Sequence, residues 1–274
     1  MSRLNLKEIF ANIFKELFQI MKKHRIFTLL IVVLIVLDVL VIVVKPQLPD
    51  VTEIKNHTLF GLALQAVIFI YTIGVFLLYR WFKTGKNVRS TLLWSLAFLC
   101  YGSTFIGMVF QSLGYVWADM KVAGIFFLYR QTMIWWIALM YVGTASVVTN
   151  SRKKQIIPAV VFFALGYAVF ITGLLVVGDI DYTMYILLYS FWTPLCAAIT
   201  YIFYLYGRDT KFASPKIIAI GFALLGITYL AWSPWHKVAF YYIWFFLFNV
   251  SIAIILLGYV LLPYEIKAKE NASA

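Results

Sequence analysis

Residues 26–44 read IFTLLIVVLIVLDVLVIVV, and Asp38 is the sole charged residue among them. A helix crosses a hydrocarbon core about 30 Å thick with roughly 20 mostly apolar residues. A strand of a transmembrane barrel is about ten residues long and alternates apolar with polar side chains. Residues 29–37 are apolar without a break, so this alternation is absent. The stretch therefore predicts a transmembrane helix and an all-α fold.

Seven further stretches of the chain have a similar length and polarity. The 274 residues are 64% apolar and 12% charged, whereas a soluble chain carries about 25% charged residues. This composition excludes a soluble enzyme, a disordered chain and a disulfide scaffold. The sequence predicts a polytopic helical membrane domain over residues 26–263 with eight transmembrane helices: 26–44, 58–79, 90–113, 122–148, 156–177, 182–206, 215–233 and 238–263.

The basic residues are distributed unevenly between the two sides that these helices create. Of the 23 lysine and arginine residues, 18 lie on the side with both termini, 4 lie on the other side, and Arg130 lies inside a span. Cytoplasmic loops are enriched in these residues, so we expect a multi-pass plasma-membrane protein with both termini in the cytoplasm. Anionic inner-leaflet lipids are the expected partners of the net charge of +12. The bases flank apolar spans and form no continuous patch, which predicts no nucleic-acid partner.

We expect different structures for the two ends of the chain outside the membrane domain. Within residues 1–25 an apolar helix face is formed by Leu6, Ile9, Phe10, Ile13, Phe14, Leu17 and Met21. This spacing predicts an amphipathic helix that lies on the cytoplasmic interface. Two roles stay open for it, an orientation anchor and a docking helix for a partner membrane subunit. Residues 264–274 are expected to be a cytoplasmic tail.

An internal repeat is suggested by two stretches that start spans of the same direction. Residues 90–106 can be laid over residues 214–230 at an offset of 124, with identities at Ser90/Ser214, Phe98/Phe222, Gly102/Gly226 and Thr104/Thr228. Parallel repeats of this kind occur among transporters. The sequence thus suggests two parallel halves of four helices each.

Ionisable groups inside a membrane cost about 2.5–3.5 kcal/mol each on insertion scales, and they mark functional sites. Asp38 and Arg130 lie roughly 9 Å and 12 Å below the same outer surface, from the rise of a helix. Gln65 lies at a similar level in the second span, and Gln131 follows Arg130. The sequence predicts an outer-half polar cluster of Asp38, Gln65, Arg130 and Gln131 that binds or transports a small polar or anionic ligand, or carries protons.

Two simpler interpretations of these residues stay open. The segment 122–148 is long enough for Arg130 to snorkel to headgroups at the interface. Alternatively, Asp38 and Arg130 form an ion pair that fixes only helix packing. In the sixth span, Pro194 is expected to bend the helix and free a carbonyl, either as plain geometry or as a gating hinge. Asn249 is expected to form an interhelical hydrogen bond.

Few other residues in the sequence suggest a cofactor site or a catalytic site. His57 and His236 fall at the outer ends of two spans, and two histidines at one depth could hold a b-type haem. No motif for a metal site or a catalytic group is found, so no cofactor and no catalytic residue are predicted, and the balance is against an enzyme. Three functions stay open: a ligand-binding or transport protein, a sensing or accessory subunit that acts through a partner, and a haem-binding redox subunit.

Overall fold

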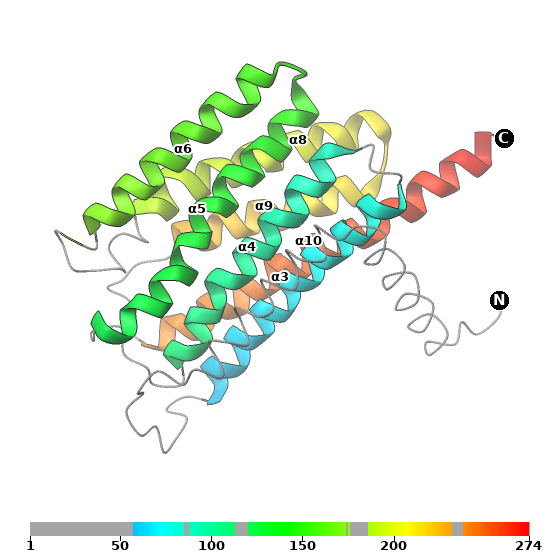
Figure 1. Cartoon of the computed structure of the whole chain (residues 1–274). Helices are drawn as coiled ribbons and strands as arrows, with labels where there is room; N and C mark the ends of the chain where they lie inside the picture. Colours follow the sequence, from blue (N-terminus) through cyan, green and yellow to red (C-terminus); the bar gives the residue numbers. More distant parts are fainter. Residues whose placement is uncertain are drawn as a thin grey trace.

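The computed structural model describes residues 57–84, 88–112, 120–173, 175, 186–231 and 238–273. These residues form helices joined by short connections, and no strand occurs among them (Figure 1). The elements are α3 (His57–Lys83), α4 (Arg89–Ser112), α5 (Met120–Val148), α6 (Arg152–Thr172), the π-helix η2 (Leu188–Trp192), α8 (Thr193–Thr210), α9 (Ala213–Leu230) and α10 (Val238–Ser273). The prediction of an all-α fold is confirmed for this part of the chain.

Six of the described helical segments are long and apolar enough to cross a membrane, which is compatible with an integral membrane protein. Each contains most of a span predicted from hydropathy. The remaining long helix, α4, also coincides with a predicted span but is richer in serine and threonine. The span at 26–44 and the amphipathic helix at 1–25 lie outside the described residues, so the count of eight helices stays a prediction.

The helix α10 continues beyond the predicted end of its span. Pro263 lies inside the helix, which runs on to Ser273 and extends past the rest of the bundle (Figure 1). A proline inside a helix removes one backbone hydrogen bond. Here good helix formers, among them glutamate, lysine and alanine, follow the proline and favour continuation. Residues predicted as a separate tail therefore belong largely to α10.

The helices pack mainly against their neighbours in sequence. Helix α4 packs against α3 and α5, α9 packs against α8 and α10, α10 packs back on α3, and α6 packs on α5. This arrangement gathers the predicted cytoplasmic ends of the helices at one end of the bundle. We call it the basic end, defined by Arg80, Lys83, Arg89, Arg152, Lys153, Lys154, Arg208, Lys211 and Lys216.

Helix α4 is joined to its neighbours by hydroxyl groups. Ser95 Oγ donates to the carbonyl of Gly74 on α3 at 2.7 Å, and Ser103 Oγ lies 2.8 Å from the hydroxyl of Tyr71. Thr104 Oγ1 lies 2.9 Å from Thr132 Oγ1 on α5. Polar groups inside a membrane need such partners. A helix surrounded by other helices can thus be less apolar than those that face lipid.

Helices α4 and α9 meet in the middle of the bundle. The rings of Phe98 and Phe222, which the proposed repeat pairs with each other, have centroids 6.4 Å apart. The hydroxyls of Tyr101 and Tyr229 are hydrogen-bonded, and both side chains are fully buried. The two four-helix halves include the segment 26–44 and stay a prediction.

Candidate ligand-binding pocket

A pocket of about 320 Å³ lies at the basic end of the bundle. Five helices contribute to it, together with the connection between α3 and α4. Its lining residues are Leu77, Arg80, Thr84, Val88, Ser90, Thr91, Trp94, Val147, Ile202, Phe203, Tyr206, Tyr259, Leu262 and Ile266. No described carboxylate, histidine or cysteine is among them, so the pocket offers groups that bind a ligand and no acid–base pair.

The polarity of the pocket changes with depth. On α3 the lining residues run from Thr84 near the helix end to Leu77, and on α10 from Ile266 to Tyr259. Seven residues of helix correspond to about 10 Å along the axis. Arg80 and most of the lining hydroxyl groups lie in the part nearer the basic end. Apolar and aromatic side chains close the inner part.

Three aromatic side chains form the inner end of the pocket. The ring centroid of Phe203 lies 5.3 Å from that of Trp94 and 6.0 Å from that of Tyr259. The indole Nε1 of Trp94 donates to Thr144 Oγ1 on α5 at 3.3 Å, which ties this wall to the next helix. All three aromatic side chains are buried. These three side chains, all on helices, close the inner end of the pocket, and we call them the aromatic wall.

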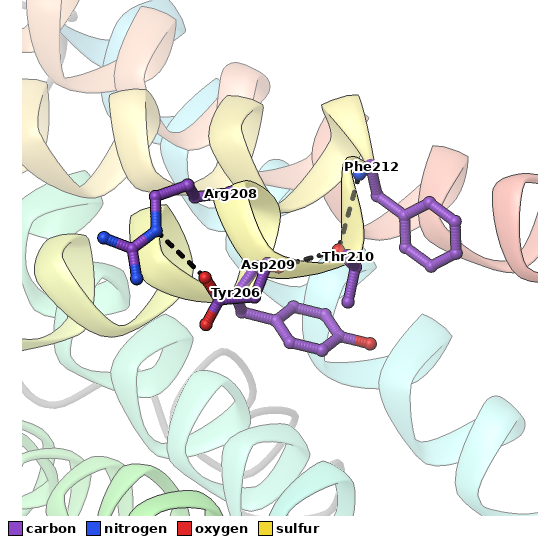
Figure 2. A network of polar contacts seen from close by, with 5 residues as sticks. All are labelled: Tyr206, Arg208, Asp209, Thr210 and Phe212. Atoms are coloured by element: carbon purple, nitrogen blue, oxygen red, sulfur yellow. Dashed lines mark hydrogen bonds and ion pairs between the residues drawn. The ribbon is translucent and has the colours of Figure 1, made fainter.

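Arg80 is half-buried and is the one cation that lines the pocket. In the part of the chain that the structure describes, the ion pair found joins Arg208 and Asp209, and Arg80 forms none. Arg208 Nε lies 2.9 Å from Asp209 Oδ1. Figure 2 shows the Arg208 side chain beside Asp209 and pointing away from the ring of Tyr206. An arginine taken partly out of water without a carboxylate favours binding of an anion.

The acidic residue on the pocket-lining segment of α10 is engaged elsewhere. Glu265 lies between the lining residues Leu262 and Ile266. Its Oε1 accepts from the backbone N–H of Ala213 at 3.1 Å, and its Oε2 accepts from the N–H and the hydroxyl of Ser214 at 3.0 and 2.6 Å. The carboxylate thus satisfies free N–H groups at the start of α9 and leaves Arg80 uncompensated.

The register of α8 sets which of its residues reach the pocket. In η2 the N–H of Thr193 and its hydroxyl both donate to the carbonyl of Leu188, five residues back. Pro194 follows directly and has no N–H to continue the ladder. Such π turns occur often at functional sites. The buried face of α8 then runs from Trp192 through Cys196 and Ile199 to Phe203, and Pro194 as a hinge stays a prediction.

Residues of the predicted outer-half cluster have separate partners where the structure describes them. Gln65 accepts from Asn249 Nδ2 at 3.4 Å, and that nitrogen also lies 2.9 Å from the carbonyl of Leu62. The interhelical role expected of Asn249 is confirmed. Gln131 accepts from the hydroxyl of Tyr167 on α6 at 3.0 Å. No described hydrogen bond joins Gln65 to Gln131.

The other predicted site residues fall outside what the structure describes. Asp38 and His236 lie outside the described residues, and Arg130 and His57 are described only as backbone positions in α5 and α3. The polar cluster and the haem pair therefore stay predictions. Among the described residues, no group of three or more histidine, cysteine, aspartate or glutamate side chains could hold a metal ion.

The sequence does not predict Arg80 as a site residue, because Arg80 lies near a predicted helix end, where a basic residue is typical of the cytoplasmic side. One signal was available: Arg80 is one helical turn inside Lys83, the last residue of α3, and is thus deeper than a loop charge. Comparison of the chain with protein-family models, with curated proteins and with solved structures gives no match.

Proposed function

We propose that this integral membrane protein binds a small anionic ligand in the pocket at the basic end. The observation that carries the proposal is a pocket of about 320 Å³ lined by a half-buried arginine that forms no ion pair among the described residues. Ligand pockets are mostly apolar and hold a few polar groups that orient the ligand. Here Arg80 and hydroxyls such as that of Thr91 provide those groups.

Binding of an alkyl phosphate to the purified full chain tests this function. Hexyl phosphate is a suitable probe because it carries a phosphate and dissolves in water. Arg80→Gln is expected to weaken binding by about 10- to 100-fold, since a hydrogen bond to a charged group contributes about 1.5–3 kcal/mol. Titration calorimetry in nanodiscs of zwitterionic lipid gives the dissociation constant.

The matched control is Arg89→Gln. Arg89 begins α4 in the same region, is exposed and does not line the pocket. Its replacement removes the same charge and is expected to change the dissociation constant by less than about twofold, because exposed charges are screened. Equal loss in both variants would show general attraction by the basic end. Absence of any binding to the unmodified chain would overturn the proposal.

The outer-half polar cluster is a separate proposal for transport of a polar ligand or protons. It rests on the matched depths of Asp38 and Arg130 in the sequence. Ligand-dependent thermal stabilisation that is lost in both Asp38→Asn and Arg130→Gln supports it. Co-purification of a second membrane chain would favour the accessory role instead. A visible absorption spectrum of the purified chain tests the proposed haem at His57 and His236.

A further inference from the structure

We infer that the pocket takes a single-chain anionic amphiphile that enters from the membrane leaflet at the basic end, with its anionic group at Arg80 and its alkyl chain against the aromatic wall. This inference rests on the proposed function and specifies its ligand class. The juxtaposition of a cation about midway along the pocket and an inner part lined mainly by apolar and aromatic side chains, about one helical turn deep beyond Arg80, carries the argument.

The apolar depth requires an apolar part on the ligand. Leu77, Phe203 and Tyr259 line the inner pocket. A small hydrated anion bound at Arg80 would leave the inner part of the pocket, beside these side chains, unfilled. An alkyl chain that enters this part leaves water and gains contacts with apolar and aromatic side chains. A ligand with an anionic head and an apolar tail therefore matches both ends of the pocket.

The size of the pocket limits the ligand to one chain. Its volume of about 320 Å³ lies at the lower end of the range of ligand pockets, roughly 300–1,000 Å³. Its interior is closed by Trp94 and Phe203, which pack on each other. A bilayer lipid with two chains would have to leave at least one of them outside.

Two of the exposed residues that line the pocket lie on α5 and α8. Val147 on α5 is 50% exposed and Tyr206 on α8 is 40% exposed, and both line the pocket. These two helices pack on each other only weakly. Their neighbouring residues Val148 and Tyr204 are also exposed. Exposed apolar and aromatic side chains on membrane helices face lipid, which favours entry of the ligand from the leaflet at this point. The lining residues Thr84 and Val88 are exposed as well, at the connection between α3 and α4.

A chain-length series of alkyl phosphates tests the inference on the full chain in zwitterionic nanodiscs. Chains of four to sixteen carbons are titrated, and binding is taken as the part lost in Arg80→Gln. Affinity against the free aqueous concentration is expected to rise about three- to fourfold per methylene while the chain fills the pocket. It then stops rising when the chain reaches the aromatic wall.

The position of this limit should depend on the wall. Phe203→Ala removes a ring from the inner end and is expected to move the limit to longer chains. Phe245→Ala removes an equally buried ring of α10 that does not line the pocket, and should leave the limit unchanged. A limit that is the same in all three proteins overturns the inference.

The side opening is tested without touching the core. Val147→Trp narrows the opening and is expected to weaken binding of the longer phosphates at least tenfold, whereas Val148→Trp, next to it and outside the lining, should not. Equal binding in both variants overturns the proposed entry route. If binding depends on Arg80 but not on the length of the alkyl chain, the inference of an amphiphilic ligand is overturned. The proposed anion site is then retained. Binding that is unaffected by Arg80→Gln overturns the proposed function itself.

Discussion

The hydroxyls of Tyr101 and Tyr229 are partners in the fully buried centre of the bundle, where Trp136 stacks on Tyr101 with ring centroids 4.6 Å apart. Tyr101→Phe leaves the second hydroxyl without this partner. We expect a loss of about 1–3 kcal/mol in the free energy of unfolding. Denaturation with sodium dodecyl sulfate in mixed micelles measures it.

The double variant separates the hydrogen bond from general packing. Tyr101→Phe with Tyr229→Phe removes both hydroxyls, so no buried group is orphaned. Its loss is expected to be smaller than the sum of the two single losses, as for residues that act through each other. Strictly additive losses would show that the two hydroxyls do not act as a pair. The exposed Tyr204→Phe serves as a control and should be neutral.

At the scale of the helix, the start of α9 is stabilised by a residue from α10. Ser214 before Pro215 predicts a local cap at this point of the sequence. In the structure the helix begins at Ala213, Phe212 occupies the cap position without a side-chain hydrogen bond, and Glu265 satisfies the free N–H groups instead. The expectation of a local cap is wrong because the packing of α10 brings a carboxylate to the same groups.

Glu265→Ala should therefore destabilise the bundle. Loss of a helix cap costs about 0.5–2 kcal/mol, and we expect a loss in this range in the same micelle assay. Asp209→Ala is the matched control at the same end. Asp209 pairs with Arg208 in an exposed position, where salt bridges contribute little, and no measurable loss is expected. Equal effects of the two substitutions would contradict the capping role.

Helices α9 and α10 also approach each other closely at Gly221. A Cβ there would meet the backbone N of Ile255 at 2.9 Å and the carbonyl oxygen of Ser251 at 3.1 Å. Backbone cannot move aside as a flexible side chain can, so Gly221→Ala is expected to cost about 1–3 kcal/mol. Gly61→Ala has open space and should be neutral or stabilising by up to about 1 kcal/mol. The measurement is again denaturation in mixed micelles, and an unchanged Gly221→Ala would contradict the close approach.

At the scale of the whole molecule, the sequence predicts the helices well and the pocket poorly. Hydropathy locates α3, α5 and α9 because the cost of placing polar groups in lipid acts on each segment separately. The pocket arises where five helices come together, and no single segment encodes that approach. Arg80 thus reads as a charge at a helix end. Asn249 was predictable because an amide in the middle of a span needs a partner wherever the neighbouring helix lies.

Because the basic helix ends lie together at one end of the bundle, we predict that all of them lie on the cytoplasmic side of the membrane. Arg89 begins α4, Lys153 lies in the first turn of α6, and Lys211 lies between α8 and α9, so cysteines introduced there report on three different places at the basic end. In a background without Cys100 and Cys196, all three are expected to react with an impermeant maleimide only after the cytoplasmic face is exposed in inverted vesicles. Cysteines at Lys121 and Asp179, on the predicted outer side, should react in intact cells. Loops rich in lysine and arginine stay in the cytoplasm. Labelling of the cysteines at positions 89, 153 and 211 from outside the cell would therefore show that the chain has the opposite orientation. Labelling of these three from different sides would contradict a bundle that spans the membrane.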